Sequence, residues 1–224
     1  MTTVLFIHGL ESGPGGRKAQ HLAEAGYSLV SMQMPCGRKH VLSDPVVLAA
    51  GLVAVATVTL AAMHSALTGA LVITGLWVAR PLARSALMRR VLKRSLAVQI
   101  QALRLNTIDC VVASSFGGAV AIELLRAGHW RGPTVLLCPA HGLVAQRAGT
   151  TMPSLGTLAP EITDKILVIQ GRQDTVVPPS HARALVSGTT ARLLEVDDDH
   201  RLKGTATPEA FASWIASVMH NTAT

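Results

Sequence analysis

Short apolar runs recur along the chain without strict alternation of apolar and polar positions, which is typical of strands buried on both faces. These runs lie at residues 3–8, 28–34, 109–114, 133–139, 165–171 and 191–197. Between several of them the apolar positions follow helical spacing, at residues 15–26, 117–128, 179–188 and 207–221. Strands that alternate with helices predict an α/β fold, with a mostly parallel sheet of about six strands flanked by helices.

One long apolar segment departs from this alternation. Residues 46–79 contain no Asp, Glu, Lys or Arg. As a single helix this segment would be about 51 Å long, well beyond the roughly 30 Å of a bilayer core. The strands before and after it must share one sheet, so only an even number of membrane crossings, or none, is compatible with the fold. We therefore expect a helical hairpin that turns within residues 63–69.

A cluster of basic side chains follows the apolar segment. Residues 80–94 hold six Lys or Arg and no acidic residue. The sequence thus divides into an α/β core at 1–44 and 106–224, an apolar helical hairpin at 45–82 that acts as a lid or membrane anchor, and a basic helix at 83–105 that leads back to the core.

The composition of the hairpin favours contact with membrane lipid through residues 46–82. Both arms are apolar all round rather than along one stripe, and the basic residues at 80–94 suit anionic headgroups and the positive-inside rule. We expect a protein associated with the cytoplasmic side of the cell membrane. The alternative is a cytoplasmic protein whose two arms pack as a lid or in a dimer interface.

Charge and cysteine content bear on whether the protein binds nucleic acid and on the cellular compartment in which it functions. The net charge is +7, with 49% apolar residues and a mean hydropathy of +0.39. The basic cluster has no interleaved aromatic residues and no recognised nucleic-acid-binding fold around it, so nucleic acid is not an expected partner. Cys36, Cys110 and Cys138 form no CxxC pair, and the N-terminal residues enter a strand without a basic signal region, which indicates a reducing compartment.

A sharp strand-to-helix turn is the first candidate for chemistry. Strand 109–114 ends at Ser114, and Ser115 is followed by Phe116, Gly117 and Gly118. Small residues are needed where a turn exposes a serine hydroxyl at the carboxyl edge of a sheet. Ser115 is therefore the predicted nucleophile, although a glycine-rich phosphate-binding turn has a similar sequence.

Two further residues supply what a serine nucleophile requires. A serine hydroxyl needs a base, and the base needs a carboxylate to orient it. Asp174 follows the strand at 165–171, and His200 follows the strand at 191–197, in the chain order Ser, Asp, His. We predict that His200 takes the Ser115 proton and that Asp174 orients His200. Each could separately be an ordinary loop residue, and His8 is interpreted as a structural residue that supports its loop.

An oxyanion hole is the fourth expected component. Its two backbone N–H donors are predicted to come from Phe116, which follows the nucleophile, and from Leu10, in the loop after the first strand. A phosphate-binding turn is the other interpretation of that loop, but it lacks the G-x-G-x-x-G pattern.

Together the stretches FIHGLESGPGGRK, ASSFGG, GRQDTVVPP and DDDHRL resemble small single-domain bacterial serine esterases of the α/β-hydrolase fold. The resemblance covers the chain apart from residues 45–105, and it departs from the family where Ala113 replaces the first glycine of G-x-S-x-G. It implies an acyl-enzyme mechanism on carboxylic esters or thioesters, with no metal and no organic cofactor. The apolar insertion adds an expected preference for apolar acyl groups.

Two other functions remain compatible with these residues. One is a non-catalytic, membrane-associated binding or adaptor protein that keeps the hydrolase fold. The other is a serine peptidase or lactonase, because the same triad serves all acyl transfer.

Overall fold

Six parallel strands form one sheet in the computed structural model, which describes residues 1–10, 12–37 and 43–220. The order across the sheet is β2-β1-β3-β4-β5-β6, and every neighbouring pair is parallel. The strands are β1 (Thr3–Ile7), β2 (Ser28–Val30), β3 (Cys110–Ser114), β4 (Thr134–Leu137), β5 (Ile166–Gly171) and β6 (Arg192–Val196). The predicted α/β fold with about six strands is confirmed.

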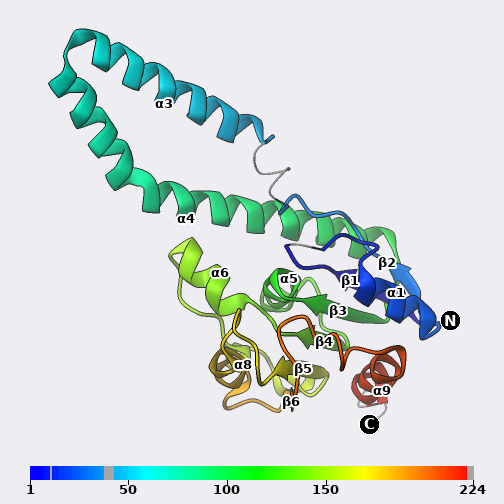
Figure 1. Ribbon diagram of the computed structural model, residues 1–224. Helices are drawn as coiled ribbons and strands as arrows, with labels where there is room; N and C mark the ends of the chain where they lie inside the picture. The colour runs from blue at the N-terminus through cyan, green and yellow to red at the C-terminus, as the bar shows by residue number, and fades with distance from the viewer. Residues whose placement is uncertain (11, 38–42, 221–224) are drawn as a thin grey trace.

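Helices cover both faces of this sheet (Figure 1). The helices within the described residues are α1 (Arg17–Glu24), α3 (Pro45–His64), α4 (Ala66–Leu105), α5 (Phe116–Arg126), α6 (His141–Ala148), α7 (Pro160–Thr163), α8 (Pro179–Val186) and α9 (Pro208–Met219), with a 3-10 turn at Leu155–Thr157. Leu5 and Ile7 of β1 pack with α4 and α5 on one face, whereas Val4 and Phe6 pack with α1 and α9 on the other. Burial on both faces explains why the strands lack alternation.

The predicted elements differ from the observed ones mainly at their ends. β2, the edge strand next to β1, stops at Val30 instead of 34. Beyond it, side chains replace the ladder: Ser31 Oγ donates to Phe6 O, and the Met34 N–H donates to His8 Nε2. The short helices α6 and α7 were not predicted, and position 221 of the last predicted helix lies outside the described residues.

The apolar insertion forms two long helices that extend away from the sheet (Figure 1). Ser65 separates α3 from α4 and caps α4 by accepting from the Thr68 N–H, within the predicted turn region. No residue of α3 is buried, and its exposed side chains include Leu52 and Leu60 at 72% and 68%. By length and composition alone, α3 and α4 are both able to cross a membrane.

Helix α4 joins the apolar arm to the core without a break. It contains Pro81 and bends along its length (Figure 1), as expected where a proline removes a helical hydrogen bond. Beyond the bend Val91 and Ala102 are buried against the sheet. The second arm of the hairpin and the basic helix expected at 83–105 are therefore one continuous element.

Part of the basic cluster is used inside the protein. Asp44, which is only 5% exposed, caps α3 by accepting from the Val46 N–H and forms ion pairs with Arg90 and Arg94 of α4. Arg89 donates to the carbonyl of Ala148 at the end of α6. These contacts fix the base of α3 and the end of α6 to α4, so the basic residues are not all free for lipid headgroups.

Candidate active site

Ser115 occupies a strained turn between β3 and α5. Its φ of 54° and ψ of −117° are rare for a residue with a side chain, and such a conformation costs roughly 1–3 kcal/mol. Three backbone hydrogen bonds hold it: the Ser115 N–H donates to Leu137 O, and the Ser115 carbonyl accepts from Gly118 N and Ala140 N, each at 2.9 Å. The turn therefore presents the Ser115 side chain at the carboxyl edge of the sheet.

Two glycines allow the helix to start this close to the sheet. A Cβ on Gly117 would lie 2.1 Å from the carbonyl oxygen of Ile7, and one on Gly118 would lie 2.7 Å from Pro139 Cβ. Ala113, in contrast, is tolerated at the first position of the motif because it lies inside β3, fully buried and paired with its neighbours. The departure from G-x-S-x-G thus leaves the turn intact.

The three predicted triad residues meet at the carboxyl edge of the sheet. His200 Nε2 lies 2.9 Å from Ser115 Oγ, and His200 Nδ1 lies 2.8 Å from Asp174 Oδ2. A carboxylate can only accept, so His200 donates through Nδ1–H, and its Nε2 is then free to accept from the serine hydroxyl. This tautomer is the one that a general base requires.

Asp174 is held as a carboxylate by several donors. Its Oδ1 accepts from the N–H groups of Val176 and Val177, both at 2.8 Å, and its Oδ2 accepts from Gln170 Nε2 at 3.0 Å as well as from His200. Burial alone would raise the pKa of Asp174, but the hydrogen bonds from His200 and the two valine amides outweigh it, and the net pKa is lowered. Gln170 was not predicted, although a buried polar residue at the end of the apolar run ILVIQG is a signal for it.

Asp198 organises the loop that carries His200. One oxygen of Asp198 accepts from the Asp199 N–H, and the other accepts from Gly204 N, Thr205 N and Thr205 Oγ1. Burial raises the pKa of Asp198, but these hydrogen bonds reverse the shift and lower it overall. Asp198 therefore has a structural role in the acidic run at 197–199.

A third glycine lets this loop cross the end of β5. A Cβ on Gly171 would lie 2.5 Å from the carbonyl oxygen of Asp198 and 2.7 Å from that of Asp199. The Gln173 N–H also donates to Asp198 O. The loops that carry Asp174 and His200 are thus fastened to each other next to the triad.

The residues expected to form the oxyanion hole lie beside Ser115. Phe116 is the first residue of α5, where backbone N–H groups have no carbonyl partner within the helix. Leu10 follows Gly9, and a Cβ on Gly9 would lie 3.3 Å from Ser115 Cβ. His8 supports this loop through both ring nitrogens, since Nδ1 donates to Gly9 O and Nε2 accepts from Met34 N.

Lys18 lies beneath the triad and was not predicted. Its ammonium donates to Ser114 Oγ at 3.1 Å. Burial lowers the pKa of Lys18, while the charges of Asp198, Asp199 and Asp174 oppose the shift. Lys18 is therefore a partly buried cation in contact with the residue that precedes Ser115.

One group of potential metal ligands includes triad residues. Ligand atoms of Cys138, Asp174 and His200 lie within 4.8 Å of one another. Burial raises the pKa of the Cys138 thiol to about 12, so at neutral pH it is not the thiolate that binds metals. Asp174 and His200 are already engaged with each other, and the group fits the predicted triad better than a metal site.

No protein-family model and no curated protein sequence matches this chain. Several solved structures are similar to it over nearly its whole length. TT1662 from Thermus thermophilus is 18% identical with a TM-score of 0.59, and the match covers 100% of this chain and 90% of that one. Est1E from Butyrivibrio proteoclasticus is 13% identical with a TM-score of 0.57, covering 98% and 88%.

A protein from Xanthomonas campestris pv. campestris that is assigned to the alpha/beta hydrolase superfamily is 19% identical with a TM-score of 0.54, and the match covers 97% of this chain and 99% of that one. At such identities the likeness concerns architecture. It agrees with a six-stranded parallel sheet flanked by helices. The chain therefore has the α/β-hydrolase fold.

Proposed function

We propose that the protein is a serine hydrolase that cleaves carboxylic esters or thioesters through an acyl-enzyme. The hydrogen-bonded series Ser115–His200–Asp174, with separations of 2.9 and 2.8 Å, is the observation that carries the proposal. A serine hydroxyl held in a strained turn with no base beside it would have no evident use, whereas with this base it becomes a nucleophile.

The proposed reaction has two halves. Ser115 Oγ attacks the carbonyl carbon while His200 Nε2 takes its proton, and the Leu10 and Phe116 N–H groups stabilise the oxyanion. The protonated His200 then donates to the leaving alkoxide or thiolate, which departs and leaves Ser115 acylated. Water attacks the acyl group with His200 again as the base, releasing the acid and restoring the serine. Asp174 keeps His200 in the required tautomer throughout.

Labelling with a fluorophosphonate probe tests the nucleophile directly. The wild-type protein should become labelled on the peptide that contains Ser115 and should hydrolyse p-nitrophenyl acetate. Ser115→Ala should lose both activities, whereas the exposed Ser213→Ala in α9 should keep them. Well-folded wild-type protein that is neither labelled nor active would favour the binding or adaptor function, and labelling of another serine would refute the assignment.

We also propose that α3 and the outer part of α4 contact membrane lipid, with the catalytic core on the cytoplasmic side. Side chains such as Leu52, Leu60 and Leu71 are 65–72% exposed. The 20 residues of α3 would span about 30 Å, close to the thickness of a bilayer core. An exposed apolar surface of this extent is costly in water, and lipid would cover it.

Vesicle flotation tests this contact. The protein should float with phosphatidylcholine vesicles that contain phosphatidylglycerol, and Leu52→Glu with Leu60→Glu should abolish flotation. Leu105→Glu, at the other end of α4 and 70% exposed, is the matched control and should float normally. A protein that stays with the buffer and elutes as a dimer would instead show that the arms pack between two copies.

A further inference from the structure

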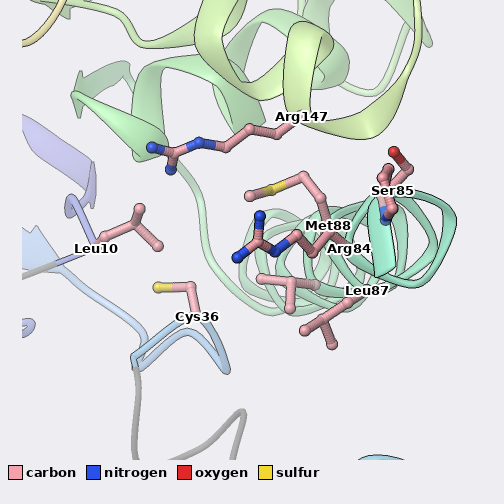
Figure 2. A pocket seen from close by; sticks show the side chains of 9 residues that line it. Leu10, Cys36, Arg84, Ser85, Leu87, Met88 and Arg147 are labelled. Atoms are coloured by element: carbon pink, nitrogen blue, oxygen red, sulfur yellow. The ribbon is translucent and has the colours of Figure 1, made fainter. Parts of the chain in front are cut away.

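A cavity of about 620 Å³ opens between the loop after β1 and the inner part of α4 (Figure 2). Its apolar wall consists of Leu10, Cys36, Leu87, Met88 and Val91. Burial raises the pKa of Cys36 to about 11, so its thiol is neutral and part of this wall. We call this space the α4–α6 cavity, because α4 and the end of α6 also supply its charged groups.

The cavity adjoins the candidate active site through Leu10. This residue lines the cavity and is also the expected second donor of the oxyanion hole. The preceding residue, Gly9, approaches Ser115 so closely that a Cβ on it would lie 3.3 Å from Ser115 Cβ. The cavity is therefore connected to the candidate active site through the loop that carries Gly9 and Leu10.

Two arginines enter the cavity from different helices. Arg84 comes from α4 and Arg147 from α6, and Figure 2 shows both guanidinium groups directed toward the side where Leu10 and Cys36 lie. Within the described residues, neither takes part in an ion pair, in contrast to Arg90 and Arg94. Both arginines are exposed to solvent, and an anion held between them would reduce their mutual repulsion.

The relative position of these arginines is fixed by contacts between their helices. Arg89 donates to the carbonyl of Ala148, and Gly149, which ends α6 with a φ of 66°, lies against Ser85 of α4. Ser85 and Ala148 are the direct neighbours of Arg84 and Arg147. Helix packing therefore sets the backbone positions from which the two arginine side chains extend into the cavity.

We propose that the α4–α6 cavity binds an anionic group of the substrate, a carboxylate or a phosphate, between Arg84 and Arg147. This inference rests on the proposed esterase function and specifies its substrate class: an ester with an apolar portion against Leu87, Met88 and Val91 and an anionic group close to the scissile bond. Guanidinium groups suit both anions because they donate two parallel hydrogen bonds. The insertion thus supplies a determinant of specificity through α4.

Binding to a protein that cannot turn over separates this inference from the hydrolase proposal. In the Ser115→Ala protein, an NMR titration should show that monomethyl succinate binds more tightly than the uncharged dimethyl succinate. Adding Arg84→Gln or Arg147→Gln should weaken monomethyl succinate binding about tenfold, equivalent to about 1.4 kcal/mol. Arg104→Gln, an exposed charge at the far end of α4, is the matched control and should change nothing.

A second arm distinguishes a soluble anion from a lipid headgroup. Wild-type protein is given phosphatidylcholine vesicles that contain either palmitoyl lysophosphatidic acid or uncharged monopalmitoylglycerol, and palmitate release is measured. The anion is a lipid headgroup if the protein prefers lysophosphatidic acid, if Arg84→Gln and Arg147→Gln abolish this preference, and if monomethyl succinate does not bind. Binding of monomethyl succinate assigns it to a soluble carboxylate.

The two proposals fail in different ways. Absence of labelling and of hydrolysis on every ester would refute the hydrolase function, while the titration would still decide whether the cavity binds anions. If charged and uncharged ligands behave alike in both arms, or if the arginine variants match Arg104→Gln, the anion site is refuted. Melting temperatures of all variants, measured by circular dichroism, exclude loss of folding as the cause.

Discussion

Gly117→Ala tests whether the turn at Ser115 depends on a close approach of α5 to β1. The new Cβ would lie 2.1 Å from the carbonyl oxygen of Ile7 and 2.7 Å from that of His8, whereas real Cβ contacts are essentially never below 3.0 Å. The start of α5 must therefore retreat by about 1 Å, because β1 pairs with a strand on each side and cannot move.

The size of the effect follows from this displacement. Overpacking lowers the free energy of unfolding by roughly 1–3 kcal/mol, and the better helix propensity of alanine offsets up to about 1 kcal/mol of this loss. A net loss of about 2 kcal/mol lowers the melting temperature by roughly 4–8 °C in a domain of this size. Phe116 and Ser115 move with the helix, and a shift of about 1 Å in a catalytic group lowers kcat/KM by about 100-fold.

Thermal unfolding followed by circular dichroism and p-nitrophenyl acetate hydrolysis measure the two effects. Gly51→Ala in α3 is the control, since no atom lies within 4 Å of the new Cβ, and it should keep or slightly raise the melting temperature. A Gly117→Ala protein with wild-type melting temperature and activity would refute the reasoning that this contact sets the position of Ser115.

Three further predictions concern loops and charges. Asp198→Ala should lower kcat/KM at least tenfold by releasing the His200 loop, whereas exposed Asp197→Ala should stay near wild type; equal losses would contradict this. The pKa of Asp174 is lowered in the folded protein, so its carboxylate stabilises the fold above pH 3.8, the ordinary pKa of Asp. This stabilisation is lost as the pH falls through the lowered pKa of the folded state. Asp174→Asn should therefore flatten the acid side of a plot of unfolding free energy against pH. Asp44→Asn should make the base of α3 more sensitive to limited proteolysis, and an unchanged cleavage rate would contradict the role of its ion pairs.

The sequence predicted those features that depend on residues close together in the chain. Buried parallel strands produce continuous apolar runs, so the six strands were predictable, and the chain order of Ser115, Asp174 and His200 follows from where those strands end. The turn after β3 was also visible, because the close approach of α5 to the sheet demands glycine at 117 and 118.

Other features depend on contacts between distant segments, which leave no local pattern. Lys18 meets Ser114 across 96 positions, and Asp44 meets Arg90 and Arg94 across the whole hairpin. The α4–α6 cavity requires Arg84 and Arg147 to face one space, and this is decided by how α4 bends and packs. In the sequence Arg84 was indistinguishable from the other members of the basic cluster at 80–94.

The continuity of α4 limits how the protein can be shortened. The same helix carries exposed apolar side chains before Pro81 and forms a wall of the cavity from Pro81 to Val91. A deletion made to improve solubility must therefore end before Pro81 and rejoin the chain so that Asp44 still reaches Arg90 and Arg94. A cut at residue 82, the end of the hairpin predicted from the sequence, would remove Pro81 from the wall of the α4–α6 cavity.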